Sequence, residues 1–147
     1  GDEIQSTPYH QHLLFNMLPR PPWFSDPHGL DALIYLDDLD GSTGPVYVVP
    51  GSHKWNDREP PYRHFDPLDN EVVFRVSAGS AVLMHSNIWH RTYPTVSANR
   101  RMLILSYTPC WLRRSPHGVK PENGLTSTVL ENASEELREL LGVSGYS

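Results

Sequence analysis

The chain has 147 residues, a formal net charge of -5 and eight histidines, and 14 prolines and 10 glycines interrupt it densely. At this length we expect one domain over residues 1–147 with a buried core. The acidic balance and the scattered basic residues argue against nucleic acid as a partner. No apolar run reaches the roughly 18 residues of a membrane span, and the N-terminus lacks a secretory apolar stretch. We therefore expect a soluble, cytoplasmic protein without a membrane partner; the sequence leaves the oligomeric state open.

The first candidate metal ligands lie near the N-terminus, where residues 9–12 read Tyr-His-Gln-His. In an extended chain, residues i and i+2 point to the same face, so His10 and His12 present two imidazoles side by side. This spacing is typical of metal ligands. Histidine pairs on a protein surface also occur by chance, so the motif alone leaves both interpretations open.

Two long loops follow, over residues 16–30 and 52–70, and the first is too rich in proline for a regular element. Long loops inside a compact domain are often lids or substrate-binding segments. Their aromatic residues are candidates to line a pocket, with packing against the core as the alternative. These residues are Trp23, Phe24, Tyr62 and Phe65.

Short strands are predicted where apolar and β-branched runs are bounded by turn residues. In chain order they cover 31–39, 46–49, 71–77, 81–84 and 102–112. We expect the first two to form an antiparallel hairpin or to be close neighbours. The fourth leads to His85 and His90, and Arg100 and Arg101 precede the fifth. An imidazole and a guanidinium at neighbouring strand ends can hold a metal and a carboxylate, or the histidine can simply be buried in a hairpin.

The C-terminal segment Ser134 to Leu141 predicts an amphipathic helix, with Ser134 as its N-cap and Gly142 as its end. About six short strands and one terminal helix are typical of a β-sandwich or jelly roll. A parallel α/β fold would need helical crossovers between strands, and no segment supplies them.

Two strings carry a resemblance: DALIYLDDLDGSTGPVYVVPGSHKW and AGSAVLMHSNIWHRTYPTVSANRRMLILSY. They resemble the phytanoyl-CoA dioxygenase family of iron(II)- and 2-oxoglutarate-dependent oxygenases, over roughly Pro8 to Trp111. The resemblance implies an all-β, cupin-like double-stranded β-helix (jelly roll) core, here with a C-terminal helix. It also implies iron(II) as the metal, 2-oxoglutarate as co-substrate, and hydroxylation of a small organic substrate.

Carried onto this sequence, the resemblance implies that His10 and His90 are the first and the distal metal ligands. Arg101, eleven residues after His90, then matches the arginine that pairs with the far carboxylate of 2-oxoglutarate. We expect Arg101, and not Arg100, to point into the barrel. Thr92 stands where the family often has a serine that helps this carboxylate, and Gln11 is the middle residue of the triad motif.

The chain departs from the family at His12, which occupies the carboxylate position of the triad, so the motif reads His-Gln-His. We expect His12 to be the third metal ligand. A neutral ligand leaves the metal site one unit more positive, so we expect weak iron binding and impaired activity. Asp26 and Asp31 are weaker candidates to replace the lost carboxylate. Such enzymes also carry a substantial N-terminal region before this motif, which the sequence lacks.

Two other functions stay open at this point. One is a non-catalytic jelly-roll module that binds a metal or small ligand without turnover, which the His-Gln-His motif favours. The other is a three-histidine metalloenzyme that uses zinc or iron without 2-oxoglutarate. The presence of Arg101 and Thr92 argues against the latter, because a site without a keto acid has little use for that pair.

Overall fold

The structure is a computed structural model that describes residues 6–12, 18–93, 100–109, 128–129 and 131–140. The chain divides into two compact units, residues 1–107 and 108–147. The expectation of a single domain over 1–147 stays a prediction. In the described part of the chain, no helix is both long and apolar enough to cross a membrane.

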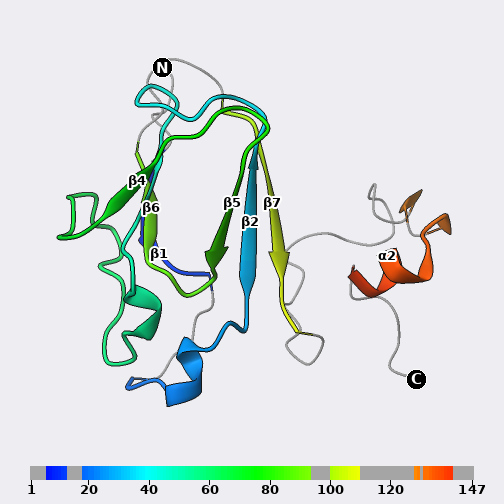
Figure 1. Cartoon of the computed structure of the whole chain (residues 1–147). Helices are drawn as coiled ribbons and strands as arrows, with labels where there is room; N and C mark the ends of the chain where they lie inside the picture. The colour runs from blue at the N-terminus through cyan, green and yellow to red at the C-terminus, as the bar shows by residue number, and fades with distance from the viewer. Residues whose placement is uncertain (1–5, 13–17, 94–99, 110–127, 130, 141–147) are drawn as a thin grey trace. The chain divides into compact units, whose positions relative to one another are not determined.

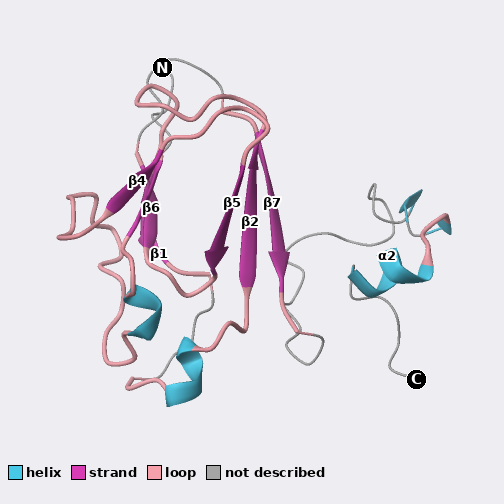
Figure 2. Ribbon diagram, in the orientation of Figure 1, coloured by secondary structure: helices cyan, strands magenta, loops and turns pink. Residues whose placement is uncertain are grey.

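The first unit contains two antiparallel sheets (Figures 1 and 2). One has the strand order β1-β6-β3-β4 and the other β5-β2-β7. The strands are β1 (Thr7–His10), β2 (Leu30–Tyr35), β3 (Val46–Val48), β4 (Val72–Phe74), β5 (Ala81–His85), β6 (His90–Thr92) and β7 (Met102–Tyr107). Two short 3-10 helices, η1 (Pro22–Ser25) and η2 (Ser52–Lys54), lie in the long loops.

The apolar core lies between the two sheets. Because side chains alternate along a strand, each strand sends every second residue to this core. The inward-facing members are Leu33 and Tyr35 of β2, Val82 and Met84 of β5, and Val46 and Val48 of β3, packed together with Leu39. This two-sheet arrangement with a shared core is the one expected of a jelly roll.

The predicted hairpin of residues 31–39 with 46–49 is wrong. β2 lies at the centre of the three-stranded sheet between β5 and β7, whereas β3 pairs with β4 and β6. The intervening turn therefore crosses from one sheet to the other. The Asp40 side chain accepts hydrogen bonds from the backbone N–H groups of Ser42 and Thr43, and Gly44 has a φ of 75°, which favours glycine.

The second unit contains α2 (Glu135–Leu140), within the helix predicted from sequence. Ser134 is its N-cap as predicted, because Ser134 Oγ accepts a hydrogen bond from the Leu137 N–H at 3.2 Å. Gly142 and residues 110–112 of the predicted last strand lie outside the described residues.

Candidate metal centre

Three histidines from two neighbouring strands converge at one place. β1 pairs with β6, and His10 and His90 are partners in the register. His12 follows β1, and its backbone N–H donates to the Ser86 carbonyl at 2.8 Å. The His90 ring centroid lies 4.1 Å from that of His10 and 4.7 Å from that of His12. One ring nitrogen from each histidine lies within 4.8 Å of the others.

The hydrogen-bond partners fix which nitrogen of each ring carries the proton. His10 Nδ1 lies 2.8 Å from the Pro8 carbonyl, and His90 Nδ1 lies 2.9 Å from the Ile88 carbonyl. His12 Nδ1 lies 2.7 Å from Asp31 Oδ2. Carbonyl and ionised carboxylate oxygens only accept hydrogen bonds, so we assign the proton of each ring to Nδ1. Each Nε2 then carries a lone pair.

These lone pairs make the cluster suited to a cation. The Nε2 atoms of His12 and His90 lie 3.2 Å apart, and neither has a proton to donate to the other. With metal–nitrogen bonds of about 2.1 Å, two such ligands at an octahedral or tetrahedral angle lie about 3.0 to 3.4 Å apart. Imidazole donors suit iron, zinc, copper and nickel, so the three side chains fit a transition metal.

Burial keeps two of the three histidines in the neutral form, which is the form that can bind a metal. His90 is 4% exposed, and burial, together with the neighbouring His10, lowers its pKa to about 3. Burial also lowers the pKa of His10 below the ordinary value for histidine. A metal binds neutral imidazole, so these two residues need lose no proton at neutral pH.

The lowered pKa of His90 predicts that the metal-free protein loses stability in mild acid. Between pH 6.5 and 3 the unfolded chain binds a proton at this residue and the folded chain does not, so stability falls as the pH falls. His90 should account for a loss of about 2 kcal/mol between pH 7 and pH 5, at 1.36 kcal/mol per pH unit below 6.5. His10 and His53, whose pKa values burial also lowers, add to the total loss. Urea unfolding of the metal-free protein at several pH values measures it.

The control for this prediction is His90→Asn, whose unfolding free energy should depend less steeply on pH in the same range. The pKa values of Asp31 and Glu71 are lowered in the folded protein. These carboxylates therefore lose their contribution to the free energy of unfolding only below about pH 4.5, outside this range. An equal slope in the wild type and the variant would contradict the prediction.

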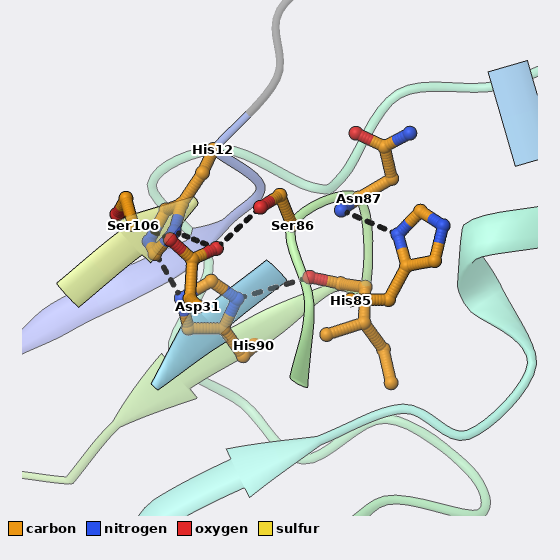
Figure 3. A network of polar contacts seen from close by, with 8 residues as sticks. His12, Asp31, His85, Ser86, Asn87, His90 and Ser106 are labelled. Carbon is orange, nitrogen blue, oxygen red and sulfur yellow. Dashed lines mark hydrogen bonds and ion pairs between the residues drawn. The ribbon is translucent and has the colours of Figure 1, made fainter. Parts of the chain in front are cut away.

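Asp31 lies next to His12, on the Nδ1 side of its ring (Figure 3). Its side chain is fully buried, and it accepts hydrogen bonds from Ser86 Oγ at 2.6 Å and from Ser106 Oγ. Burial raises the pKa of Asp31, but the hydrogen bonds from His12, Ser106 and Ser86 outweigh it, so the pKa lies below its ordinary value. Asp31 is therefore an ionised carboxylate on the Nδ1 side of His12, away from the facing Nε2 atoms. Asp26 is exposed.

The expectation that Arg101 points into the barrel is wrong. Arg101 is 70% exposed and forms a two-pronged ion pair with Asp37, with contacts of 2.6 and 3.1 Å. In β7, Ser106 faces Asp31 and Met102 packs against the core, so the even-numbered residues face inward. By this alternation Arg100 stands on the inner side of the strand, where its Nη1 donates to the Gly44 carbonyl.

The remaining predicted cofactor residues lie in β6 and next to β1. Thr92 shares the His90 face of β6 by alternation, and its Oγ1 accepts the Thr7 N–H at 3.0 Å. Gln11 is 4% exposed, and its Nε2 has no hydrogen-bond partner among the described residues. Their role in binding the co-substrate stays a prediction.

Other residues singled out from the sequence lie elsewhere. His85 stacks on His53, with ring centroids 4.9 Å apart, and is not a member of the three-histidine cluster. Of the loop aromatics, Phe24 is buried in the core at 1% exposure. Trp23, Tyr62 and Phe65 are exposed.

A buried ion pair on the opposite face of β6 was not predicted from the sequence. Arg91 is 2% exposed and its guanidinium binds both carboxylate oxygens of Glu71, at 2.6 and 3.1 Å. The Tyr9 hydroxyl donates to the same carboxylate, and the guanidinium lies 4.2 Å from the Tyr47 ring centroid. Because Tyr9 and Arg91 each neighbour a histidine of the cluster, this network ties together the strands that present His10 and His90. The available signal in the sequence was an arginine, Arg91, directly next to the candidate ligand His90.

Residues 1–103 match the phytanoyl-CoA dioxygenase (PhyH) family. The iron/alpha-ketoglutarate-dependent dioxygenase ausO of Aspergillus calidoustus is 29% identical over 110 residues, covering 71% of this chain and 36% of the relative. The chain thus spans about a third of the length of this curated relative.

Two solved structures show the same fold. The nickel complex of the non-heme monooxygenase ThoJ has a TM-score of 0.51 at 19% identity, over 72% of this chain and 38% of that one. The apoform of EctD from S. alaskensis has a TM-score of 0.53 at 19% identity, over 80% of this chain and 44% of that one. The predicted all-β jelly-roll fold, cupin-like and with one small helix among the described residues, is confirmed.

Proposed function

This chain belongs to the phytanoyl-CoA dioxygenase family, and on that premise we propose that it is the metal-binding core of an iron(II)- and 2-oxoglutarate-dependent dioxygenase. The proposed reaction is hydroxylation of a small organic substrate. One observation supports it above the others: one ring nitrogen from each of His10, His12 and His90 lies within 4.8 Å of the others, and their Nδ1 partners leave each Nε2 lone pair available.

In this proposal the three histidines hold iron(II), which when bound supplies the redox chemistry of the reaction. The residues of the chain hold the metal and orient the ligand rings. Backbone carbonyls fix the His10 and His90 rings, Asp31 fixes the His12 ring, and the buried position of His90 limits the access of water to the ligands. Three donors on one side leave positions open for a keto acid.

An arginine at the start of β7 is proposed to bind the far carboxylate of 2-oxoglutarate, since a planar guanidinium holds a carboxylate with two hydrogen bonds. The alternation along β7 supports Arg100 in this role, because Arg101 is already paired with Asp37 on the outside. We expect Arg100→Ala to lose 2-oxoglutarate binding by at least about tenfold, consistent with a charge-assisted contact of 1.5 to 3 kcal/mol. Calorimetric titration of 2-oxoglutarate into the metal-loaded protein measures it.

The matched control is Arg101→Ala, which removes the same side chain from the next position. It should bind 2-oxoglutarate nearly as well as the wild type, because the lost partner is an exposed ion pair. Loss of binding in Arg101→Ala with retention in Arg100→Ala would return the role to Arg101.

The proposed activity is tested by metal analysis of protein purified without chelator, followed by measurement of succinate release with iron(II), 2-oxoglutarate and oxygen. Succinate release above that of a His10→Ala control supports the dioxygenase. Three neutral imidazole donors also suit zinc, which favours a metalloenzyme without a keto acid as the second candidate. Tight zinc binding without 2-oxoglutarate binding would select that candidate.

A further inference from the structure

The metal-ligand motif lacks its carboxylate, but a buried carboxylate contacts the histidine that stands in its place. In the motif, the position of His12 belongs to an acidic ligand, which would offset part of the charge of the metal. Here the buried Asp31 carboxylate lies 2.7 Å from His12 Nδ1, on the side of the ring opposite to Nε2. The negative charge is therefore retained, but on the far side of an imidazole.

The position of Asp31 is built into the sheet. Asp31 lies in the central strand β2, with Met84 of β5 and Ser106 of β7 as its register partners. Both carboxylate oxygens accept hydrogen bonds: Oδ2 from His12 and Ser86, and Oδ1 from Ser106 (Figure 3). Neighbours on both sides thus hold the carboxylate, and it cannot turn toward the Nε2 atoms without breaking these contacts.

We propose that Asp31 is a positioning residue, which orients His12 with its Nε2 toward the metal and supplies through His12 the charge that the altered motif lacks. The inference rests on the proposed metal site. A carboxylate on the outer nitrogen of a ligating histidine fixes the tautomer and makes the inner nitrogen a stronger donor. The centre is then a His-His-His set with the overall charge of the usual two-histidine, one-carboxylate set.

The first test uses Asp31→Asn, which keeps the shape and an acceptor oxygen but removes the charge. Cobalt(II) is titrated anaerobically into the metal-free protein and followed by its visible absorption, which reports the ligand environment. We expect affinity to fall about 10- to 100-fold and the absorption bands to shift, as for other partners of ligating histidines. Asp37→Asn is the matched control, because Asp37 lies just beyond the same strand and pairs with Arg101 instead.

A second readout needs no metal. Nitrogen-15 NMR of the metal-free protein reports which ring nitrogen of His12 carries the proton. The wild type should show the Nδ1–H form, and Asp31→Leu, which removes the acceptor, should show a mixture of forms. An Nε2–H form of His12 in the wild type would overturn the inference directly.

The third test moves the carboxylate back to the ligand position. His12→Asp alone places a second carboxylate beside Asp31, so like charges oppose each other when the metal is absent and the fold is less stable. His12→Asp combined with Asp31→Asn keeps one carboxylate, now as a direct ligand. We expect the double variant to bind cobalt(II) at least about tenfold more tightly than Asp31→Asn alone, and this gain to exceed the change that His12→Asp causes in the wild type, as coupled sites require.

The outcomes separate this inference from the proposed function. If the wild type binds cobalt(II) and Asp31→Asn binds it equally well, the role of Asp31 is wrong and the metal site stands. If the wild type binds no metal, the metal site itself is wrong and the inference falls with it. Thermal unfolding of each variant checks that a loss of affinity does not reflect an unfolded protein.

Discussion

His90→Ala is expected to abolish tight metal binding, with the affinity for iron(II) reduced by more than about 100-fold. The His90 ring centroid lies 4.1 Å from that of His10 and 4.7 Å from that of His12, and His90 is almost fully buried. Its removal leaves two donors where the family chemistry needs three on one face. Changes to residues that only support a ligand already cost about 10- to 100-fold, so loss of a ligand must cost more.

Anaerobic equilibrium dialysis against iron(II), with metal analysis of the retained protein, measures the effect. His64→Ala is the matched control, since His64 is 60% exposed and lies outside the cluster. Far-ultraviolet circular dichroism should show that both variants keep the fold. Undiminished iron binding by a folded His90→Ala protein would mean that the metal, if bound, lies elsewhere.

The His10–His12 pair was predictable from the sequence because its signal is local. His10 and His12 share a face through the two-residue repeat of an extended chain, and this parity needs no knowledge of the rest of the fold. The distal histidine followed from the resemblance of its flanking string to a known family. Their convergence then required only that the two segments become neighbouring strands, and β1 and β6 do so.

The assignment of the inward-facing arginine shows where prediction from residue spacing fails. A spacing of eleven residues from His90 selected Arg101, but the face of a strand residue depends on the register of that strand with its neighbours, and a shift of one residue reverses it. The register of β7 is set by its pairing with β2, which aligns Ser106 with Asp31. Arg100 therefore lies on the inner side and Arg101 on the outer side, the reverse of what the spacing predicts.

Asp31 could be identified from the sequence as a candidate carboxylate, but its contacts could not be predicted. Its three partners lie 19, 55 and 75 residues away along the chain, so the contact depends on the whole sheet order β5-β2-β7. The same sheet order made the predicted hairpin wrong. Sequence neighbours were assumed to pair, whereas the central position of β2 requires strands from later in the chain.

The second large effect concerns stability. Arg91→Met should lower the free energy of unfolding of the metal-free protein by about 3 to 5 kcal/mol, the usual cost of removing one partner of a buried ion pair. Arg91 is 2% exposed and Glu71 has a side chain only 12% exposed, so the substitution leaves a carboxylate without its cation. Urea unfolding followed by fluorescence measures the change.

Two further variants separate the unpaired charge from the loss of packing. Arg91→Met combined with Glu71→Gln removes both charges and should recover a substantial part of the lost stability, because no buried charge then lacks a partner. Arg58→Met removes an exposed partner of Asp57, whose side chain is 65% exposed, and should cost less than about 1 kcal/mol. A loss below about 1 kcal/mol in Arg91→Met would contradict the structural role of the pair.

The same variant connects stability to the metal centre. Tyr9 and Arg91 meet at Glu71 on one face of β1 and β6, while His10 and His90 meet on the other. If the ion pair holds the two strands in register, Arg91→Met should also weaken cobalt(II) binding under conditions in which the protein is still folded. Arg58→Met should leave cobalt(II) affinity unchanged. Normal affinity in a folded but destabilised Arg91→Met protein would show that the β1–β6 hydrogen bonds alone position the histidines.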